Sequence, residues 1–92
     1  MTKLAEVLTG PETWAQGFAH REGTYCLVTA LWMLHDDTGT PDAEFLRMQR
    51  VIHAQGAPKY TSSWVWNDEP GRTWEEVASV VEAYDRDRML NP

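Results

Sequence analysis

The stretch "TWEEVASVVEAY", residues 73–84, decides the fold, because it predicts a helix more clearly than any other part of the chain. Its apolar side chains recur at the spacing of an amphipathic helix and form one continuous stripe. The members of this stripe are Trp74, Val77, Ala78, Val81 and Tyr84. Thr73 and Glu76 match a T-x-x-E capping box, in which each side chain satisfies a backbone N–H group at the helix start. We therefore expect a helix to begin immediately after Thr73.

Two segments nearer the N-terminus also carry helical spacing. Residues 3–9 contain leucine and valine at this spacing, and the Gly-Pro pair that follows should end the helix, with Pro11 opening a further short turn. Residues 41–55 follow Thr40, a favoured N-cap residue, and precede a glycine suited to a helix end. One face of this second segment carries Phe45, Leu46, Met48, Gln49 and Ile52.

The segment between them, residues 25–35 with the sequence "YCLVTALWMLH", is apolar at nearly every position. Periodicity therefore does not distinguish a buried helix from a buried strand here. The length of the segment, its alanine and leucine content and a capping residue at Thr24 favour a helix, whereas Tyr25 leaves a strand open at its start. We expect the central, most buried helix of the protein in this segment.

Residues 56–73 form a connection of eighteen residues without a helical pattern. So long a connection is uncommon in a small domain, and it usually indicates a function or an unrecognised element. If the segment is extended, alternate side chains share one side of it. These side chains are Tyr60, Ser62, Trp64 and Trp66. We expect the segment either to pack as a strap across the helices or to pair outside the chain.

Together these segments predict an all-α fold, a compact bundle of about four helices with a long extended segment before the last helix. We expect a single domain over residues 1–92, because a chain of this length normally builds one core. The longest apolar run is about half the length that a membrane-spanning helix needs, and the N-terminus lacks the apolar run of a signal peptide.

The composition limits the partners and the setting. Fourteen acidic and eight basic side chains give a formal net charge of −6. Charge repulsion therefore opposes direct binding to nucleic acids and to anionic membranes, and we expect neither. Cys26 is the only cysteine, which excludes an intramolecular disulfide and favours a cytoplasmic location.

Residue types suited to catalysis or metal binding are present, but their settings indicate structural roles. A nucleophilic cysteine would need a histidine base beside Cys26, whereas the apolar run around it predicts a buried, unreactive thiol. His35 and the three aspartates that follow it lack the spacing of known metal motifs and fit a helix end with a turn. We expect a protein that is not an enzyme and that has no catalytic residue, metal site or cofactor.

Three short motifs occur in order along the chain. They are W-x-Q-G at residues 14–17, C-x-x-x-A-L at residues 26–31 and W-N-D-x-x-G-R-T at residues 66–73. In this order they resemble a family of small proteins of unknown function that is widespread in bacteria, especially actinobacteria, and in their phages. The resemblance spans residues 4–84 and implies a phage or mobile-element setting. No established activity accompanies the family, so the resemblance assigns no catalytic residue.

The stretch from Tyr60 to Arg72 contains the strongest candidates for a binding surface. The candidates are Tyr60, Trp64, Trp66, Asn67, Asp68 and Arg72. Tryptophan and arginine are enriched at the energetic centres of protein interfaces. A structural role is open for the same stretch, since its polar residues and its Pro-Gly pair favour a turn and Trp66 can pack on the last helix. We expect Trp64 to be largely exposed and Trp66 to be buried.

We therefore expect a non-enzymatic protein-recognition module, an accessory protein of a phage or mobile element that acts on a host component. The partner is expected to be another protein or a second copy of the chain. Two other functions stay open at this point. The helices and the 56–73 segment could hold a nucleotide-like ligand between tryptophan and arginine. Alternatively, the carboxylates could stand in for phosphates in an acidic inhibitor that mimics DNA, although arginines interrupt the acidic surface.

Overall fold

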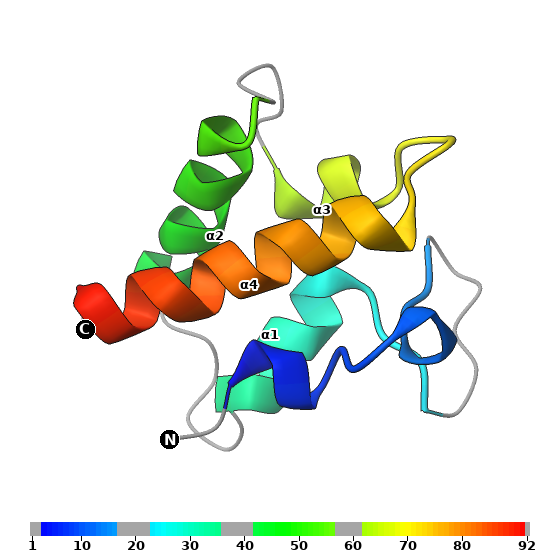
Figure 1. Ribbon diagram of the computed structural model, residues 1–92, viewed down its shortest axis with the longest axis horizontal. Coiled ribbons are helices and arrows are strands. Elements are labelled where there is room, and N and C mark those ends of the chain that lie inside the picture. Colours follow the sequence, from blue (N-terminus) through cyan, green and yellow to red (C-terminus); the bar gives the residue numbers. More distant parts are fainter. Residues whose placement is uncertain (1–2, 17–22, 36–41, 57–61, 92) are drawn as a thin grey trace.

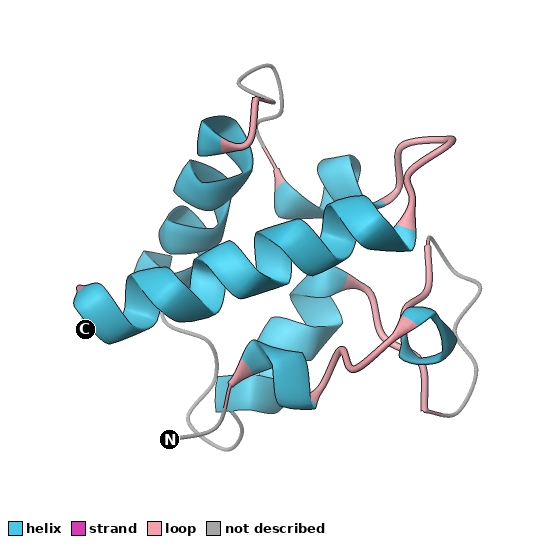
Figure 2. Cartoon of the chain, in the orientation of Figure 1, coloured by secondary structure: helices cyan, strands magenta, loops and turns pink. Residues whose placement is uncertain are grey.

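The computed structural model describes residues 3–16, 23–35, 42–56 and 62–91. Within these ranges the chain forms four α-helices, two short 3-10 turns and no strand, and Figure 2 shows only helices and loops there. The elements are η1 (Leu4–Glu6), η2 (Pro11–Thr13), α1 (Leu27–His35), α2 (Asp42–Ala54), α3 (Ser63–Asn67) and α4 (Trp74–Leu90). The expected all-α fold of about four helices is confirmed, and so is the short turn that opens at Pro11.

The last helix, α4, crosses the molecule at the front of the view in Figure 1, and the other elements lie above, below and behind it. α2 and α3 lie on one side of α4, and α1 lies on the other side with the N-terminal segment. α4 packs mainly against α2 and η1, while α3 packs against both α1 and α2. Because α4 is covered on both sides, it contributes buried side chains from a wide face.

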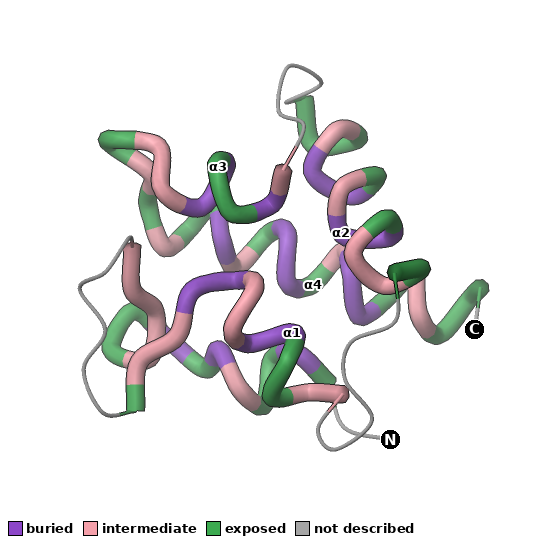
Figure 3. Tube along the Cα trace, turned by 180° about the vertical axis from the view of Figure 1, so that it is seen from behind, coloured by how far each residue is buried: buried purple, intermediate pink, exposed green. Residues whose placement is uncertain are grey.

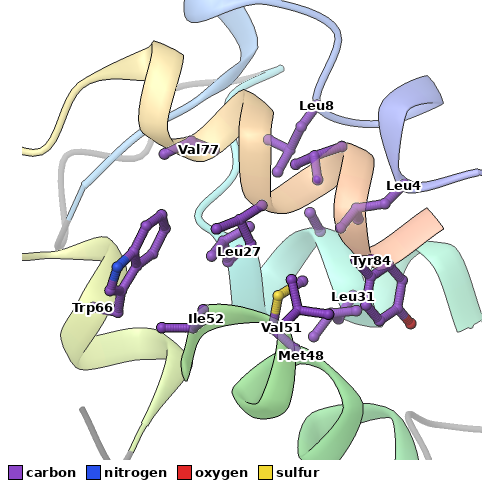
Figure 4. Packing of buried hydrophobic residues seen from close by; sticks show 13 residues of the cluster. Leu4, Leu8, Leu27, Leu31, Met48, Val51, Ile52, Trp66, Val77 and Tyr84 are labelled. Carbon is purple, nitrogen blue, oxygen red and sulfur yellow. The ribbon is translucent and has the colours of Figure 1, made fainter. Parts of the chain in front are cut away.

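One cluster of buried apolar side chains forms the core of the described residues (Figure 4). Its members are Leu4, Leu8, Leu27, Ala30, Leu31, Met48, Val51, Ile52, Trp66, Val77, Val80, Val81 and Tyr84. Val80 is buried although it lies outside the predicted stripe of α4, whereas Trp74 and Ala78 are only partly buried. A single apolar stripe assumes that only one side of the helix is covered. Because α4 packs against both α2 and η1, Val80 is buried as well.

The start of α4 is the capping box that the sequence predicts. Thr73 Oγ1 accepts a hydrogen bond from the backbone N–H of Glu76 at 3.3 Å. In return, Glu76 Oε1 accepts a hydrogen bond from the backbone N–H of Thr73 at 2.9 Å. Two of the N–H groups that a helix start leaves without helical partners are satisfied in this way.

The expected first helix over residues 3–9 is shorter than predicted and consists of the single 3-10 turn η1. Its start is capped from the far end of the chain, because the buried carboxylate of Asp85 accepts hydrogen bonds from Leu4 N at 2.8 Å and Ala5 N at 3.1 Å. A segment this short does not form a stable helix by itself. The contact with α4 therefore determines the conformation of this segment.

Helix α1 begins at Leu27 rather than at Tyr25. Tyr25 instead pairs with the N-terminal segment in an isolated parallel bridge, in which Tyr25 N donates to Thr13 O at 2.7 Å and Ala15 N donates to Tyr25 O at 3.1 Å. The strand character that the sequence suggests at this point is thus limited to one residue. Cys26 stands before the helix in place of the expected Thr24, and its Sγ accepts from the backbone N–H of Thr29 at 3.4 Å.

Helix α2 ends close to the predicted position. Gly56 has a φ of 95°, a left-handed conformation that favours glycine just past a helix end, and its N–H donates to His53 O at 3.1 Å. The start of α2 is described from Asp42 onward. The predicted cap at Thr40 lies outside the described residues.

The segment before α4 differs from the expected extended strap, because residues 63–67 form the short helix α3. Ser62 is its N-cap, and Ser62 Oγ accepts from Trp64 N at 3.2 Å and from Val65 N at 3.5 Å. The helical turn places Trp64 and Trp66 on different sides, so the predicted row of aromatic side chains does not form. Tyr60, the first member of that row, lies outside the described residues.

Candidate functional site

Helix α3 has both exposed and buried positions along its short length (Figure 3). Trp64 is 51% exposed, whereas Trp66 is 3% exposed and belongs to the core cluster. Both expectations from the sequence are confirmed. The difference matters because an exposed indole is available to a partner, whereas a buried indole fixes the position of the helix that carries the exposed one.

Arg72 holds Trp66 from the side of α4. Its guanidinium lies 4.1 Å from the centroid of the Trp66 ring, and its Nε donates to Trp66 O at 2.9 Å. Its Nη1 also pairs with Glu76 Oε2 at 3.0 Å in the first turn of α4. Cation–π stacking and charge-assisted hydrogen bonds together link α3 to α4. Arg72, a predicted binding residue, is therefore part of the support of the site.

A tight turn connects these two helices. Arg72 N donates to Glu69 O at 3.0 Å, and Gly71 between them has a φ of 85°. Proline at the second position and a glycine of positive φ at the third are the requirements of a type II turn, which Pro70 and Gly71 meet. The Pro-Gly pair therefore acts as the sequence predicts, and the turn directs the chain from α3 into the Thr73 cap.

Asn67 lies fully buried where three parts of the chain meet. Its Oδ1 accepts from Trp14 Nε1 at 2.7 Å and from Leu27 N at 3.2 Å, at the start of α1. Its Nδ2 donates to Ala15 O at 3.1 Å and to Asp68 Oδ1 at 3.0 Å. The side chain thus makes four hydrogen bonds, the full capacity of an amide group, and these bonds give it a structural role.

Gln16 completes this connection between the N-terminal segment and α3. Its Nε2 donates to Asn67 O at 3.0 Å and to Glu69 O at 2.9 Å, the carbonyls at the end of α3. The residues of the W-x-Q-G and W-N-D motifs therefore contact one another directly. Both motifs stand out in the sequence, but their spacing does not predict that they contact each other.

The exposed face of α3 and the following turn surround a shallow hollow of about 440 Å³. Five residues line it, and we call them the Trp64 surface: Trp64, Val65, Asp68, Glu69 and Pro70. Val65 is 55% exposed beside the half-exposed Trp64. Of the six predicted binding residues, Trp64 and Asp68 belong to this surface. Val65, Glu69 and Pro70 were not predicted, because their placement depends on the helical turn that the sequence did not reveal.

A polar network that the sequence did not predict joins the ends of α1, α2 and α4. Tyr84 is fully buried, and its hydroxyl donates to Glu44 Oε1 at 2.6 Å. His35 Nε2 lies 3.3 Å from the same hydroxyl oxygen, which accepts a hydrogen bond from the Nε2–H of His35 because the hydroxyl proton is donated to Glu44. Arg47 Nε lies 3.3 Å from Glu44 Oε1, and Arg47 Nη1 lies 2.5 Å from Asp87 Oδ2.

The surroundings shift the protonation of all three central groups. Burial lowers the pKa of His35, an effect that Glu44 opposes and Arg88 reinforces. Burial by itself would raise the pKa of Glu44, but the hydrogen bond from Tyr84 and the charge of Arg47 outweigh it and lower this pKa. Burial and the Glu44 carboxylate raise the pKa of Tyr84. The network therefore holds a neutral tyrosine and an ionised glutamate, and its interior position indicates a structural role.

Other groups with chemical potential have structural surroundings. Cys26 is a buried free thiol, as the sequence predicts, and its Sγ lies 3.3 Å from Thr29 Oγ1. Within the described ranges, no group of three or more histidine, cysteine, aspartate or glutamate side chains is arranged to hold a metal ion. A second hollow, of about 590 Å³, lies between η1 and α4 and includes Leu8, Trp74 and Met89 among its lining residues.

These features define a class of protein: a small all-α protein in which a short, firmly held helix presents an exposed tryptophan. The chain belongs to a family of unknown function, DUF6197, whose family model matches residues 1–86. The expectation of a family of unknown function is thereby confirmed. No curated protein and no solved structure matches the chain. Of the helices that the structure describes, none has the length and apolar character needed to cross a membrane.

Proposed function

We propose that the protein is a non-enzymatic protein-recognition module and that the Trp64 surface is its binding site. The observation that supports this most strongly is the exposure of two adjacent apolar side chains, Trp64 and Val65, on the same short helix. Exposed apolar groups gathered at one place are typical of interaction surfaces, and tryptophan is the residue type most enriched at their energetic centres.

The support beneath this surface favours recognition as well. Trp66 and Asn67 lie on the buried side of α3 and are held by Arg72, Trp14 and the start of α1. A binding group that is fixed before it meets its partner loses less conformational entropy on association. The five-residue length of α3 would not make it stable alone, so these contacts are what keep the indole of Trp64 in position.

The W-x-Q-G and W-N-D-x-x-G-R-T motifs receive a common explanation in this proposal. We assign them the task of holding α3 against the N-terminal segment, so that family members share the support while the exposed residues determine the partner. The setting that we propose is the bacterial cytoplasm, with the protein acting on a host component as an accessory factor of a phage or mobile element.

The two alternative functions have less support. A nucleotide-like ligand would need an open indole face near an arginine, but Arg72 already covers the face of the buried Trp66. A DNA mimic would need a continuous array of unpaired carboxylates, whereas Glu44, Glu76 and Glu82 each pair with an arginine. Neither observation weakens recognition through the Trp64 surface.

The experiment compares three purified proteins: wild type, Trp64→Ala and Trp32→Ala. Trp32 provides the matched control, because it is a tryptophan of 55% exposure on α1 rather than on α3. Each protein is immobilised and exposed to a lysate of the source cells, and each retained partner is purified and its affinity measured by calorimetry. Self-association is measured in parallel by analytical ultracentrifugation.

We expect Trp64→Ala to weaken association at least about a hundredfold, a loss typical of an energetic centre, while Trp32→Ala retains the wild-type affinity. Equal affinities for wild type and Trp64→Ala would refute the proposed binding site. A small molecule that copurifies with wild type and not with Trp64→Ala would replace the proposal by ligand binding.

A further inference from the structure

We infer that the partner is recognised through a cationic side chain, an arginine foremost, set beside an aliphatic residue in an exposed segment of a protein. The inference rests on the proposed function, since it names the chemistry that the Trp64 surface selects. The observation behind it is that the exposed indole of Trp64 lines the same hollow as the acidic residues Asp68 and Glu69.

Among the described residues that line the hollow, the only charged side chains are acidic. Asp68 and Glu69 are its ionisable members, and the other three lining residues are apolar. Both of these side chains are acidic, so the lining residues contribute negative charge to the hollow. A cationic group that enters it would meet attraction from both, and an anionic group would meet repulsion from both.

Both carboxylate-bearing residues are attached to fixed parts of the structure. Asp68 Oδ1 accepts from the buried Asn67 Nδ2 at 3.0 Å, which orients the carboxylate. The backbone carbonyl of Glu69 accepts from Gln16 Nε2 at 2.9 Å and from Arg72 N at 3.0 Å. The charges thus stand on a preorganised frame, the arrangement that gives selective recognition at low entropic cost.

The exposed indole adds a second interaction that selects cations. A guanidinium or ammonium group is attracted to the face of an aromatic ring, most strongly to that of tryptophan, and arginine adds planar stacking and bidentate pairing with carboxylates. A hollow of about 440 Å³ is of the size that holds one or two side chains. A cation over Trp64 would leave Val65 to contact an aliphatic neighbour in the same segment.

Other occupants fit this surface less well. Nucleic acids and anionic membranes would bring further negative charge to the two carboxylates. A symmetric dimer through this surface would bring two copies of the same acidic patch together, so that like charges would be close to one another. A basic segment of a different protein avoids both conflicts.

The test uses the nitrogen-15-labelled protein and follows the indole N–H signal of Trp64, identified by its loss in Trp64→Ala. Three matched peptides serve as probes: acetyl-Gly-Arg-Leu-Arg-Gly-amide and its counterparts with glutamine or glutamate in place of arginine. We expect a saturable shift with the arginine peptide, with an affinity at least about tenfold above that of the glutamine peptide, and no shift with the glutamate peptide.

Two charge variants sharpen the result. Asp68→Asn/Glu69→Gln removes both charges while keeping an acceptor for Asn67, and it should lower the affinity for the arginine peptide about tenfold, to that of the glutamine peptide. The control Glu82→Gln removes an exposed carboxylate that lines the other hollow, between η1 and α4, and should keep the wild-type affinity. Unchanged melting temperatures in both variants establish that folding is intact.

The outcomes separate this inference from the proposed function. Equal binding of the arginine and glutamine peptides, or no binding of either, would overturn the cationic partner; the loss of the captured protein in Trp64→Ala would still support the proposed function. Peptide binding that persists in Trp64→Ala, followed by the backbone amide signals that shift in the wild type, would overturn the recognition of a cation by Trp64. A dimer abolished by Trp64→Ala but insensitive to Asp68→Asn/Glu69→Gln would overturn the cationic partner in favour of a second copy of the chain.

Discussion

The side chain of Asn67 illustrates, at the scale of one residue, how a buried polar group can determine local structure. It satisfies an indole N–H, a backbone N–H at the start of α1 and a backbone carbonyl of the N-terminal segment. The Leu27 N–H is buried and the other two groups are partly buried, and a buried group left without a partner costs about 1–3 kcal/mol. Few other side chains could replace it, because an amide offers donors and acceptors at the same position.

The first prediction concerns this residue. Asn67→Ala should lower the free energy of unfolding by about 3 kcal/mol or more, since it leaves Trp14 Nε1, Leu27 N and Ala15 O without their partner. Chemical denaturation with circular dichroism measures the loss. Asn91→Ala, at an exposed position after α4, should stay within about 0.5 kcal/mol of wild type. A similar loss in both variants would contradict the special role of Asn67.

The second prediction compares the two tryptophans of α3. Trp66→Ala should cost about 3–5 kcal/mol, because it removes a buried aromatic side chain and the stacking partner of Arg72. Trp64→Ala should change the free energy of unfolding by no more than about 0.5 kcal/mol, as is usual for exposed positions. Both values come from the same denaturation experiment. Equal destabilisation by the two substitutions would show that Trp64 belongs to the core.

At the scale of the elements, the structure separates helices that local sequence determines from those that distant contacts determine. α4 begins at a capping box formed by neighbouring residues and continues to Leu90. Because the residues that form this start are neighbours in the sequence, a substitution at the cap alone should change the stability of α4.

The third prediction tests that start. Thr73→Ala should lower the free energy of unfolding by about 1 kcal/mol, the usual cost of losing a side-chain N-cap. Thr73→Ser keeps the accepting hydroxyl and should recover most of this loss. Urea denaturation of the two variants provides the measurement, and an unchanged midpoint in Thr73→Ala would place the start of α4 elsewhere.

The same distinction explains how much of the fold and site the sequence predicts. The core helices were predictable, because spacing, caps and local apolar content specify them. The exposure of Trp64 and the burial of Trp66 were expected for an extended segment, so this agreement does not come from the correct local structure. α3 was not predictable, since five residues are too few to show a helical period and its support comes from Trp14, Gln16 and Arg72. η1 depends on Asp85, which lies 81 positions after Leu4 and gives no local signal.

At the scale of the whole molecule, the polar network ties three helices together and makes their packing sensitive to pH. His35 comes from α1, Glu44 from α2 and Tyr84 from α4. A hydrogen-bonded group in such a network contributes to stability only in the protonation state that the network accepts. The dependence of the free energy of unfolding on pH, measured below neutral pH, therefore tests the contact between these helices.

The fourth prediction follows from the direction of the two shifts. The pKa of His35 is lowered by folding from its ordinary 6.5, so below pH 6.5 the unfolded chain binds more protons and stability falls as the pH falls. The pKa of Glu44 is also lowered, from 4.5, so its contribution is present above pH 4.5 and is lost as the pH falls through the folded value. The two groups act in the same direction and in successive pH ranges.

The free energy of unfolding of the wild-type protein should thus decrease as the pH falls below 6.5 and decrease further as the pH falls below 4.5. His35→Gln should flatten the first decrease and keep the second, whereas Glu44→Gln should flatten the second. Urea denaturation at constant ionic strength across this range measures all three profiles. A His35→Gln profile parallel to that of the wild type between pH 6.5 and 4.5 would show that His35 does not couple protonation to the packing of α1 against α4.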